Sequence, residues 1–472
     1  MACTGFLSFV SGLKCASAKE SDLQERLLII GGVAAGLAAA MEARRRAPEA
    51  EITVLEKTVD VSYGACGLPY VIGGVIPTLD RLVLHTPDYF SDQHNIKLHL
   101  QVEAQEILPA KSVVRARDVS GETREYGYTR LVIAMGAAAI CPPLPGHELE
   151  GVLVLRHMQD GRRALEYMER RRPRRAVVVG AGYIGLEMAE AFHARGLQTT
   201  LIEASDRVMS TLGGSLRDRV ARELRSRGIE IIFGEKVSAF EGSSGSIERV
   251  ITERGRAVEA EIVSIGVGVR PHTELAREAG IETGESGAIK TDAQMRTNVA
   301  NVYAAGDCCE VLHRVSGQSV WFPLGQPAVK QGWIAGANAV EDGTQERYSG
   351  VVGTNVVKVF DLEVARTGLS ETEAHAAGFD AFAVESESFS RAGYYPGGSR
   401  ILTRIVSDRR GRLLGAQMTG REGVAQRIDV YAAALYSNLK VEDIERFDLA
   451  YAPPYAPTID PILRAAHKAR KP

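Results

Sequence analysis

The 472-residue chain lacks any run of about 18 apolar residues, so no membrane-spanning helix is predicted. It also lacks a basic excess, because 56 lysines and arginines stand against 59 acidic residues and the formal net charge is −3. This balance argues against a nucleic-acid-binding protein. The chain has only six cysteines, too few for a disulfide framework at this length, which predicts a reducing compartment, the cytoplasm. No metal site is predicted.

Residues 1–26 lack the features of a targeting signal. Their apolar stretch, residues 6–13, is short and almost no positive charge precedes it. A secretory signal has a basic start and a longer apolar core, and a transit peptide carries arginines. We expect residues 1–26 to be a disordered extension or the product of an over-early start codon, with a targeting role as the alternative.

The chain does contain two strand–turn–helix units typical of dinucleotide binding. In the first, the apolar run 26–30 leads into a turn from Gly31 to Gly36 and then an alanine-rich helix. Gly31 permits a tight turn and Gly36 permits close helix packing, so a pyrophosphate can lie on the helix N-terminus. Val33 replaces the usual middle glycine. The next strand ends in Glu56, at the number of residues beyond the turn where a carboxylate commonly binds a ribose hydroxyl. This strand and its acidic end support dinucleotide binding although the glycine motif is incomplete.

The second unit carries the full G-x-G-x-x-G pattern, with Gly180, Gly182 and Gly185 after an apolar strand. Its following strand ends in Glu203, which would pair with a free ribose 2′-OH and repel a 2′-phosphate. NADH is therefore predicted over NADPH, although NADPH stays possible.

Two dinucleotide sites imply two dinucleotides, and FAD with NAD(P)H is the usual pair. A further strand ends at Asp307, and in two-dinucleotide flavoproteins such an aspartate reaches the ribityl chain of the flavin. Strands that end at Gly136 and Gly266 would mark two crossings between the nucleotide domains. The predicted domains are an FAD-binding domain of residues 27–149 and 267–340 and an inserted NAD(P)H-binding domain of residues 150–266.

Cys66 lies ten residues beyond Glu56, at the predicted start of a helix close to the flavin. A helix N-terminus stabilises a thiolate, which is the form that attacks disulfides. A dithiol reductase would carry a second cysteine five residues on, but that position is Val71, and the segment 448–461 has no histidine to relay a proton. Cys66 therefore works alone, forming a mixed disulfide, persulfide or sulfenic acid with an external partner.

The chain resembles the single-cysteine branch of the pyridine nucleotide–disulfide oxidoreductases, and most of all its coenzyme A disulfide reductases and NADH-dependent persulfide reductases. The cysteine loop 62–70 reads Ser-Tyr-Gly-Ala-Cys-Gly-Leu-Pro-Tyr, whereas similar oxidases follow the cysteine with Gly-Ile or Gly-Met. The two glycine turns and the segments 303–308 and 353–361 also carry the resemblance. It implies an α/β fold with two Rossmann-like domains, like that of glutathione reductase, and an α+β dimerisation domain over residues 341–472.

The resemblance also implies roles for individual residues. Tyr394 and Tyr451 lie in segments that face the cysteine in coenzyme A disulfide reductases, the second from the other subunit, which implies a homodimer. These tyrosines would donate hydrogen bonds to sulfur or protonate the leaving thiolate. Two departures weaken the case for coenzyme A: Ala65 stands where asparagine is common, and His94 replaces a lysine.

The implied contacts fall into three sets. Coenzyme A, as ligand or substrate, would meet Arg44, Arg45, Ser62 and His94. FAD would meet Gly31, Val33, Ala34, Gly36, Glu56, Lys57, Ser62, Gly136 and Asp307. NAD(P)H would meet Gly180, Gly182, Tyr183, Ile184, Gly185, Glu203 and Gly266.

The predicted activity is reduction of coenzyme A disulfide, coenzyme A persulfide or a related small disulfide. A hydride would pass from NADH to FAD beside Tyr183, and electrons would then reach a mixed disulfide on Cys66. An NADH oxidase or peroxidase that cycles Cys66 through sulfenic acid is an alternative. A redox-sensing interaction protein is the alternative from another class.

Overall fold

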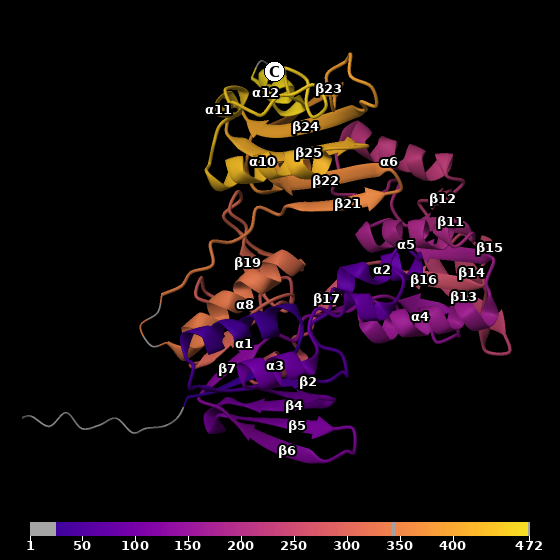
Figure 1. The fold of residues 1–472 in the computed structure, drawn as a ribbon. Coiled ribbons are helices and arrows are strands. Elements are labelled where there is room, and N and C mark those ends of the chain that lie inside the picture. The colour runs from indigo at the N-terminus through magenta and orange to yellow at the C-terminus, as the bar shows by residue number, and fades with distance from the viewer. Residues whose placement is uncertain (1–24, 342, 344, 471–472) are drawn as a thin grey trace, which may run out of the picture.

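The computed structural model describes residues 25–341, 343 and 345–470. The prediction for residues 1–26 therefore lies outside the described residues, except at its end. There, Arg26 already opens the first strand, one residue before the predicted domain boundary. Figure 1 shows three bodies: an indigo-to-violet body that also carries orange segments, a magenta body beside it, and an orange-to-yellow body above.

The first body is built on a parallel five-stranded sheet in which apolar strands pair in register. Its strands, in spatial order, are β18 (Val302–Ala304), β7 (Arg130–Ile133), β1 (Arg26–Ile30), β2 (Glu51–Glu56) and β3 (Ile96–Leu100). The near-continuous apolar sequence of β1 fits a strand that is buried on both faces. Helices α1 (Ala34–Arg46) and α8 (Gly325–Val340) pack together on one face. A Cβ added to Gly336 would lie 2.2 Å from the carbonyl oxygen of Ala39, so only glycine allows this close approach.

The second body is inserted between β7 and β18 and is built on a second parallel sheet. Its strands, in spatial order, are β12 (Glu230–Phe233), β11 (Gln198–Glu203), β10 (Arg175–Val179), β16 (Ile262–Ile265) and β9 (Val152–Val154). Its helices are α4 (Met158–Arg171), α5 (Tyr183–Ala194) and α6 (Gly214–Ser226). The two crossings pair with each other as the antiparallel strands β8 (Ala137–Ala139) and β17 (Val269–Pro271), directly after Gly136 and shortly after Gly266.

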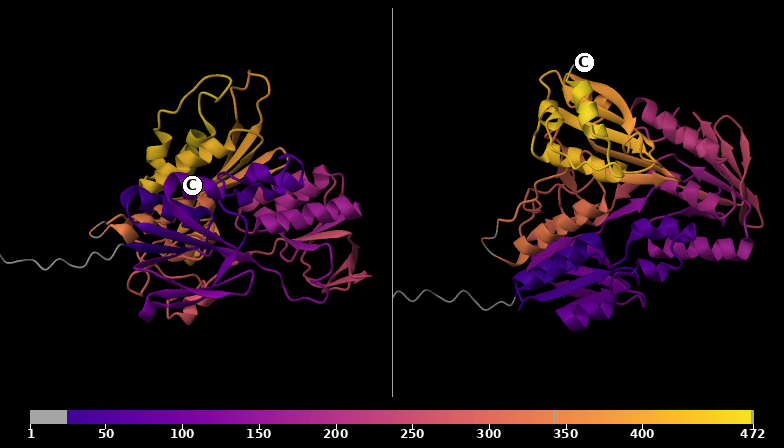
Figure 2. Two further views of the ribbon diagram at one scale, coloured as in Figure 1. Left: turned by 60° about the horizontal axis from the view of Figure 1, so that its bottom comes forward. Right: turned by 45° about the horizontal axis from the view of Figure 1, so that its top comes forward.

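The third body is an antiparallel sheet with helices on it. Its strands, in spatial order, are β21 (Asn355–Val359), β22 (Leu362–Gly368), β25 (Leu413–Gly420), β24 (Arg400–Asp408) and β23 (Ala381–Phe389). Its helices are α9 (Glu371–Ala376), α10 (Val424–Tyr436), α11 (Val441–Glu445) and α12 (Pro461–Ala469). The edge strand β21 packs against α5 of the second body, whereas β23 forms the opposite edge. Figure 2 shows the same three bodies from two further sides.

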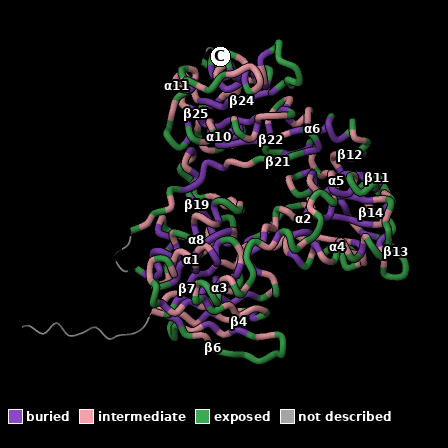
Figure 3. The backbone as a smooth tube through the Cα atoms, viewed as in Figure 1, coloured by how far each residue is buried: buried purple, intermediate pink, exposed green. Residues whose placement is uncertain are grey.

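Shorter elements complete the described chain. They are η1 (Ala65–Gly67), α2 (Leu68–Ile72), η2 (Leu79–Leu82), α3 (Pro87–His94), β4 (Val102–Leu108), η3 (Pro109–Lys111), β5 (Val113–Asp118), β6 (Thr123–Gly127), β13 (Val237–Ser243), β14 (Ser246–Thr252), β15 (Ala257–Glu259), α7 (Glu274–Glu278), β19 (Glu310–Leu312) and β20 (Ser319–Trp321). The central strands of the large sheets are buried, and exposed backbone concentrates in the connections (Figure 3). In the part of the chain that the structure describes, no helix is both long and apolar enough to cross a bilayer. The predicted α/β fold class, with two dinucleotide-binding units and a C-terminal α+β unit, is confirmed.

Candidate active site

The two glycine turns have the same backbone geometry. Gly31 and Gly180, the first residue of each turn, have φ of 109° and 101°. A Cβ added to Gly36 would lie 1.8 Å from the Gly31 oxygen, and one added to Gly185 would lie 1.9 Å from the Gly180 oxygen. Each turn therefore needs glycine at both positions, the first for its conformation and the second for helix packing.

The carboxylates of Glu56 and Glu203 also occupy equivalent places. Glu56 Oε2 accepts a hydrogen bond from the Gly32 N–H at 2.8 Å, and Glu203 Oε2 accepts one from the Ala181 N–H at 2.7 Å. The other oxygen of each carboxylate accepts the backbone N–H two residues further along the chain. Both acids therefore fix the turn before a ligand arrives, and each lies at the strand end where a ribose would bind.

The turns fit two dinucleotides. The N-terminal N–H groups of α1 and α5 receive no side-chain cap, and their N-cap residues are Val33 and Gly182. An added Cβ at Gly182 or Gly136 would meet nothing within 4 Å, so the backbone is open to a ligand at both places. Uncapped N–H groups at a helix N-terminus form an anion site suited to a pyrophosphate. Ala34, beside the first turn, is also exposed.

Asp307 follows β18 and forms an ion pair with Arg156. Arg156 also donates a hydrogen bond from Nε to the carbonyl oxygen of Ala137 at 3.1 Å, so it links the two nucleotide-binding bodies at their crossing. The two charges act on Cys66 in opposite directions, since Arg156 lowers its pKa and Asp307 raises it. The sequence analysis did not identify Arg156. Its sequence signal is a positive charge two residues before α4, near the crossing between the two nucleotide-binding bodies.

Cys66 lies in η1, immediately before α2, and its side chain reaches the surface. The pKa of its thiol is nevertheless raised, first by burial of the sulfur among its neighbours and then by the charge of Glu187. Burial and the charge of Glu187 therefore oppose the stabilisation of a thiolate that is expected from the helix start. The physical reason is that η1 has three residues and α2 has five, too few to build a strong dipole, so the cysteine's own N–H lowers the pKa less than burial raises it.

Two residues that sequence reasoning missed lie beside Cys66. Burial raises the pKa of Glu187 to about 7, against which the neighbouring Tyr70 acts. Burial and the charge of Glu187 raise the pKa of Tyr70 to about 12. The sequence signal that could have found them is spacing: Tyr70 is four residues after Cys66, and Glu187 is four after Tyr183.

Tyr183 begins α5, and its hydroxyl donates a hydrogen bond to Asn355 of β21. The side chain is partly buried, which raises its pKa, whereas the next residue, Ile184, is exposed. Gly266 lies behind this turn, because a Cβ added to it would lie 3.1 Å from the Gly185 nitrogen. The structure thus gathers the predicted NAD(P)H residues around one turn.

The structure brings Tyr394 and Tyr451 together. Their hydroxyl oxygens are 3.1 Å apart, and the side chains are 76% and 48% exposed. Tyr394 follows β23, the edge of the third sheet opposite the edge that packs on α5. Strand β23 lies at the top of Figure 1, away from α2 and α5 of the same chain.

Three of the four residues predicted to contact coenzyme A lie at the ends of α1 and α3, and they differ in whether their side chains are already bonded to the protein. Arg44 donates hydrogen bonds to the carbonyl oxygens of Pro48, Asn95 and His94, which assigns it to joining the ends of α1 and α3. Arg45 is exposed and pairs with Glu42. The His94 Nε2 atom is buried without a hydrogen-bond partner.

Ser62 and Lys57 complete the predicted contacts around the first turn. Ser62 is buried and adopts φ of 51°, and its N–H donates to the Gly32 oxygen at 3.3 Å. This bond holds the cysteine loop against the first glycine turn. Lys57 is exposed directly after Glu56.

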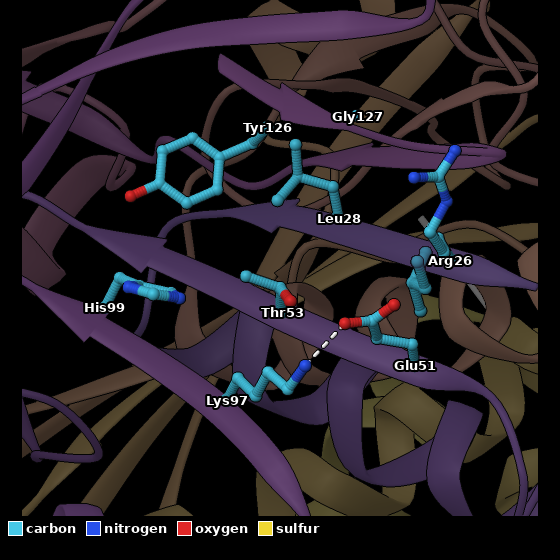
Figure 4. A pocket seen from close by; sticks show the side chains of 9 residues that line it. Arg26, Leu28, Glu51, Thr53, Lys97, His99, Tyr126 and Gly127 are labelled. Carbon is cyan, nitrogen blue, oxygen red and sulfur yellow. Dashed lines mark hydrogen bonds and ion pairs between the residues drawn. The ribbon is translucent and has the colours of Figure 1, made fainter. Parts of the chain in front are cut away.

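A hollow of about 200 Å³ lies on the first body, away from both glycine turns (Figure 4). Its lining includes the ion pair of Lys97 with Glu51, and the rings of His99 and Tyr126 lie edge to face at 5.3 Å. None of the predicted site residues lines it. It is a gap between the parallel sheet and the β4–β6 sheet, and it takes no part in the candidate site.

The pyridine nucleotide-disulphide oxidoreductase family matches residues 25–332, and the dimerisation domain of that family matches residues 354–461. The chain belongs to this family. The predicted class, a flavoprotein oxidoreductase that uses FAD and a pyridine nucleotide, is thereby confirmed.

Among curated proteins, the chain is 40% identical to an NAD(P)H sulfur oxidoreductase (CoA-dependent) of Pyrococcus abyssi, over 93% of this chain and 97% of that protein. It is 33% identical to an NADH oxidase of Methanocaldococcus jannaschii, over 94% and 99%. It is 31% identical to a coenzyme A disulfide reductase of Staphylococcus haemolyticus, over 94% and 99%.

Two solved structures superpose closely. The reduced CoADR-RHD protein of Bacillus anthracis has a TM-score of 0.92 at 33% identity, covering 95% of this chain and 80% of that chain. An NAD-dependent persulfide reductase from A. fulgidus has a TM-score of 0.91 at 36% identity, covering 94% and 83%. The chain is similar to both over all three bodies.

Proposed function

We propose that this protein is an FAD-dependent NAD(P)H reductase of coenzyme A disulfide, coenzyme A persulfide or a related small disulfide. The observation that carries the proposal is a surface-accessible Cys66 without a resolving cysteine, since the dithiol position is filled by the buried Val71. A lone thiol must exchange with an external sulfur compound. The similarity to a sulfur oxidoreductase, a persulfide reductase and a coenzyme A disulfide reductase supports this substrate class.

The residues of the two turns would hold the cofactors. FAD would lie on Gly31, Val33, Ala34 and Gly36, with Glu56, Lys57, Ser62, Gly136 and Asp307 around it. NAD(P)H would lie on Gly180, Gly182, Ile184, Gly185 and Gly266, with Glu203 at its ribose and Tyr183 toward the flavin. When bound, FAD accepts a hydride from the pyridine nucleotide and supplies two electrons to sulfur.

Cys66 performs the sulfur chemistry. As a thiolate it attacks one sulfur of the substrate, the substrate S–S bond breaks, and one thiol leaves while a mixed disulfide forms on Cys66. Two electrons then restore the Cys66 thiolate and release the second thiol. In a homodimer, the exposed Tyr394–Tyr451 pair of one subunit would face Cys66 of the other and donate a proton or a hydrogen bond to the departing sulfur.

Arg45, Ser62 and His94 would meet coenzyme A. Arg45 is the exposed arginine of its helix end, and its pair with Glu42 is a solvent-exposed ion pair, which is weak and can be exchanged for a phosphate. The buried Nε2 atom of His94 makes no hydrogen bond within the described residues, so it could bond a ligand. Arg44 is left out of this set because its donors already bind carbonyl oxygens.

Anaerobic NADH oxidation tests the substrate class. Coenzyme A disulfide or coenzyme A persulfide is expected to be consumed faster than oxygen under air by at least about tenfold in kcat/KM. Mass spectrometry of the unreduced protein should find a thiol compound disulfide-linked to Cys66. Fast oxidation under air with slow disulfide turnover would instead establish the NADH oxidase function, which the similarity to the NADH oxidase of Methanocaldococcus jannaschii makes the second candidate.

Glu203 is expected to set the preference for NADH. The wild-type protein should favour NADH over NADPH, and Glu203→Ala should lower that kcat/KM ratio by about tenfold or more, because the carboxylate bonds a 2′-OH and repels a 2′-phosphate. The ratio is the measurement, since loosening of the turn through the lost Ala181 bond affects both nucleotides alike. An unchanged ratio would remove Glu203 from the ribose site.

A further inference from the structure

The antiparallel sheet of the third body carries a row of polar side chains across its five strands. Residues directly opposite each other on antiparallel strands point to the same face, and the register pairs each member of the row with the next. From the β21 edge to the β23 edge, this polar row consists of Asn355, Arg366, Gln417, Arg404 and Glu385. Gln417 is only 1% exposed and Arg366 only 5%, so both need hydrogen-bond partners inside the protein.

Gln417 finds its partners in the loop of residues 204–213, which joins β11 to α6 in the second body. Its Nε2 donates to the carbonyl oxygen of Thr211 at 3.1 Å, and its Oε1 accepts the N–H of Gly213 at 2.7 Å. Arg366 donates to the same Thr211 oxygen at 3.4 Å. The end of the loop therefore cannot leave the sheet without breaking both bonds of a buried amide.

The same loop is bonded to the second glycine turn and to its acidic residue. It begins directly after Glu203, and the Ser205 N–H donates to the Glu203 carboxylate at 2.8 Å. It returns to the turn at Met209, whose N–H donates to the carbonyl oxygen of Ala181 at 3.0 Å. Met209 adopts φ of 46°, a left-handed conformation that persists in a residue with a side chain only where the surroundings hold it. The loop therefore borders the place where the ribose would bind, and its shape depends on what holds it.

The ends of the polar row contact the segments on either side of this loop. The hydroxyl of Tyr183, the first residue of α5, donates to Asn355 at the β21 edge. At the β23 edge, the hydroxyl of Ser215 in α6 donates to Glu385 at 2.6 Å. Helices α5 and α6 lie beside the third sheet in Figure 1. One face of the third sheet thus contacts both the helix that follows the glycine turn and the loop that closes on the turn.

We propose that the third body positions the pyridine nucleotide, with Gln417 as the positioning residue that fixes the loop of residues 204–213 against the second glycine turn. This deepens the proposed function and rests on its assignment of NAD(P)H to that turn. A site that is formed for only part of the time binds its ligand more weakly, in proportion to the fraction formed. Release of the loop should therefore weaken NADH binding without slowing hydride transfer in the bound complex.

Gln417→Leu in the FAD-loaded protein tests this role, because leucine is close to glutamine in size and makes neither bond. The dissociation constant of NADH should rise by about tenfold, since two lost hydrogen bonds lower the fraction of closed loop. The limiting rate of flavin reduction should stay within about twofold, because the bound complex is unchanged. Stopped-flow absorbance of the flavin under nitrogen, over a range of NADH concentrations, gives both values.

The reaction mixture contains no disulfide, so an error in the proposed substrate class changes neither value. Failure of NADH to reduce the wild-type flavin would instead contradict the proposed function itself, together with the nucleotide assignment on which this inference rests.

Gln417→Glu and Glu387→Gln are the companion variants. Gln417→Glu keeps the acceptor for the Gly213 N–H and loses the donor to Thr211, so NADH binding should weaken by only about threefold. It also gives the comparison if the leucine variant is unstable. Glu387 of β23 pairs with Arg219 of α6, in the same contact between the two bodies. Its replacement should leave NADH binding within about twofold, because a partly exposed ion pair is weak.

Amide hydrogen exchange of residues 204–213 gives a second measurement. Exchange should be faster in Gln417→Leu than in the wild type, and saturating NADH should slow it again. The proposal is overturned if the loop exchanges faster while the dissociation constant of NADH stays the same, or if Glu387→Gln weakens NADH binding as much as Gln417→Leu does. A lower limiting rate with an unchanged dissociation constant would also contradict it.

Discussion

Replacing Cys66 by serine is expected to lower NADH-dependent disulfide reduction by at least roughly 10³-fold, because a serine hydroxyl neither forms the mixed disulfide nor ionises at neutral pH. FAD should stay bound at the wild-type ratio, since the residues proposed to hold it lie on the glycine turn and strand ends. Steady-state NADH oxidation under nitrogen and the flavin-to-protein absorbance ratio measure the two effects.

The matched control is Cys141→Ser. Cys66 and Cys141 are the exposed free cysteines of the described chain, and Cys141 lies outside the site, in the crossing after β8. Its replacement should leave turnover within about twofold, as surface substitutions usually do. Retention of full disulfide turnover in Cys66→Ser would end the single-cysteine scheme, and loss of flavin in that variant would make the result a binding defect.

The nucleotide turns could be predicted from the sequence because their determinants are local. A five-residue strand with four apolar residues, a glycine with positive φ and a second glycine that packs the helix all lie within about a dozen residues, and β1 and β10 have the predicted bounds. The equivalent carboxylates Glu56 and Glu203 followed from the same spacing, and the structure shows both bonded to their turns.

The acid–base surroundings of Cys66 could not be predicted, because they depend on contacts between distant segments. Glu187 reaches Tyr70 across 117 residues of chain, and Arg156 reaches Asp307 across 151. Burial, the main cause of the raised pKa of Cys66, is a property of packing that no sequence window contains. The same holds for Arg44, which the family resemblance assigned to coenzyme A and which donates to three carbonyl oxygens instead.

Two alanine substitutions in one turn are expected to separate folding from nucleotide binding. Gly185→Ala places a methyl group 1.9 Å from the Gly180 oxygen, so the backbone must shift, at a cost of about 3 kcal/mol in the unfolding free energy of this body. NADH should then fail to reduce the flavin, whereas dithionite, which needs no nucleotide site, should still reduce it. Thermal unfolding and anaerobic flavin absorbance follow the two properties.

Gly182→Ala is the partner variant, because its methyl group would meet nothing within 4 Å and its backbone φ of −82° suits any residue. The fold and the bound FAD should be unchanged, yet the methyl group would stand in the open space where the pyrophosphate approaches the backbone, raising the KM for NADH by about tenfold or more. An unchanged KM would mean that the nucleotide does not cross this turn. An equal loss of thermal stability in both variants would show that the open space at Gly182 is needed for packing. The difference between the Gly182 and Gly185 variants therefore decides whether this turn is a ligand site.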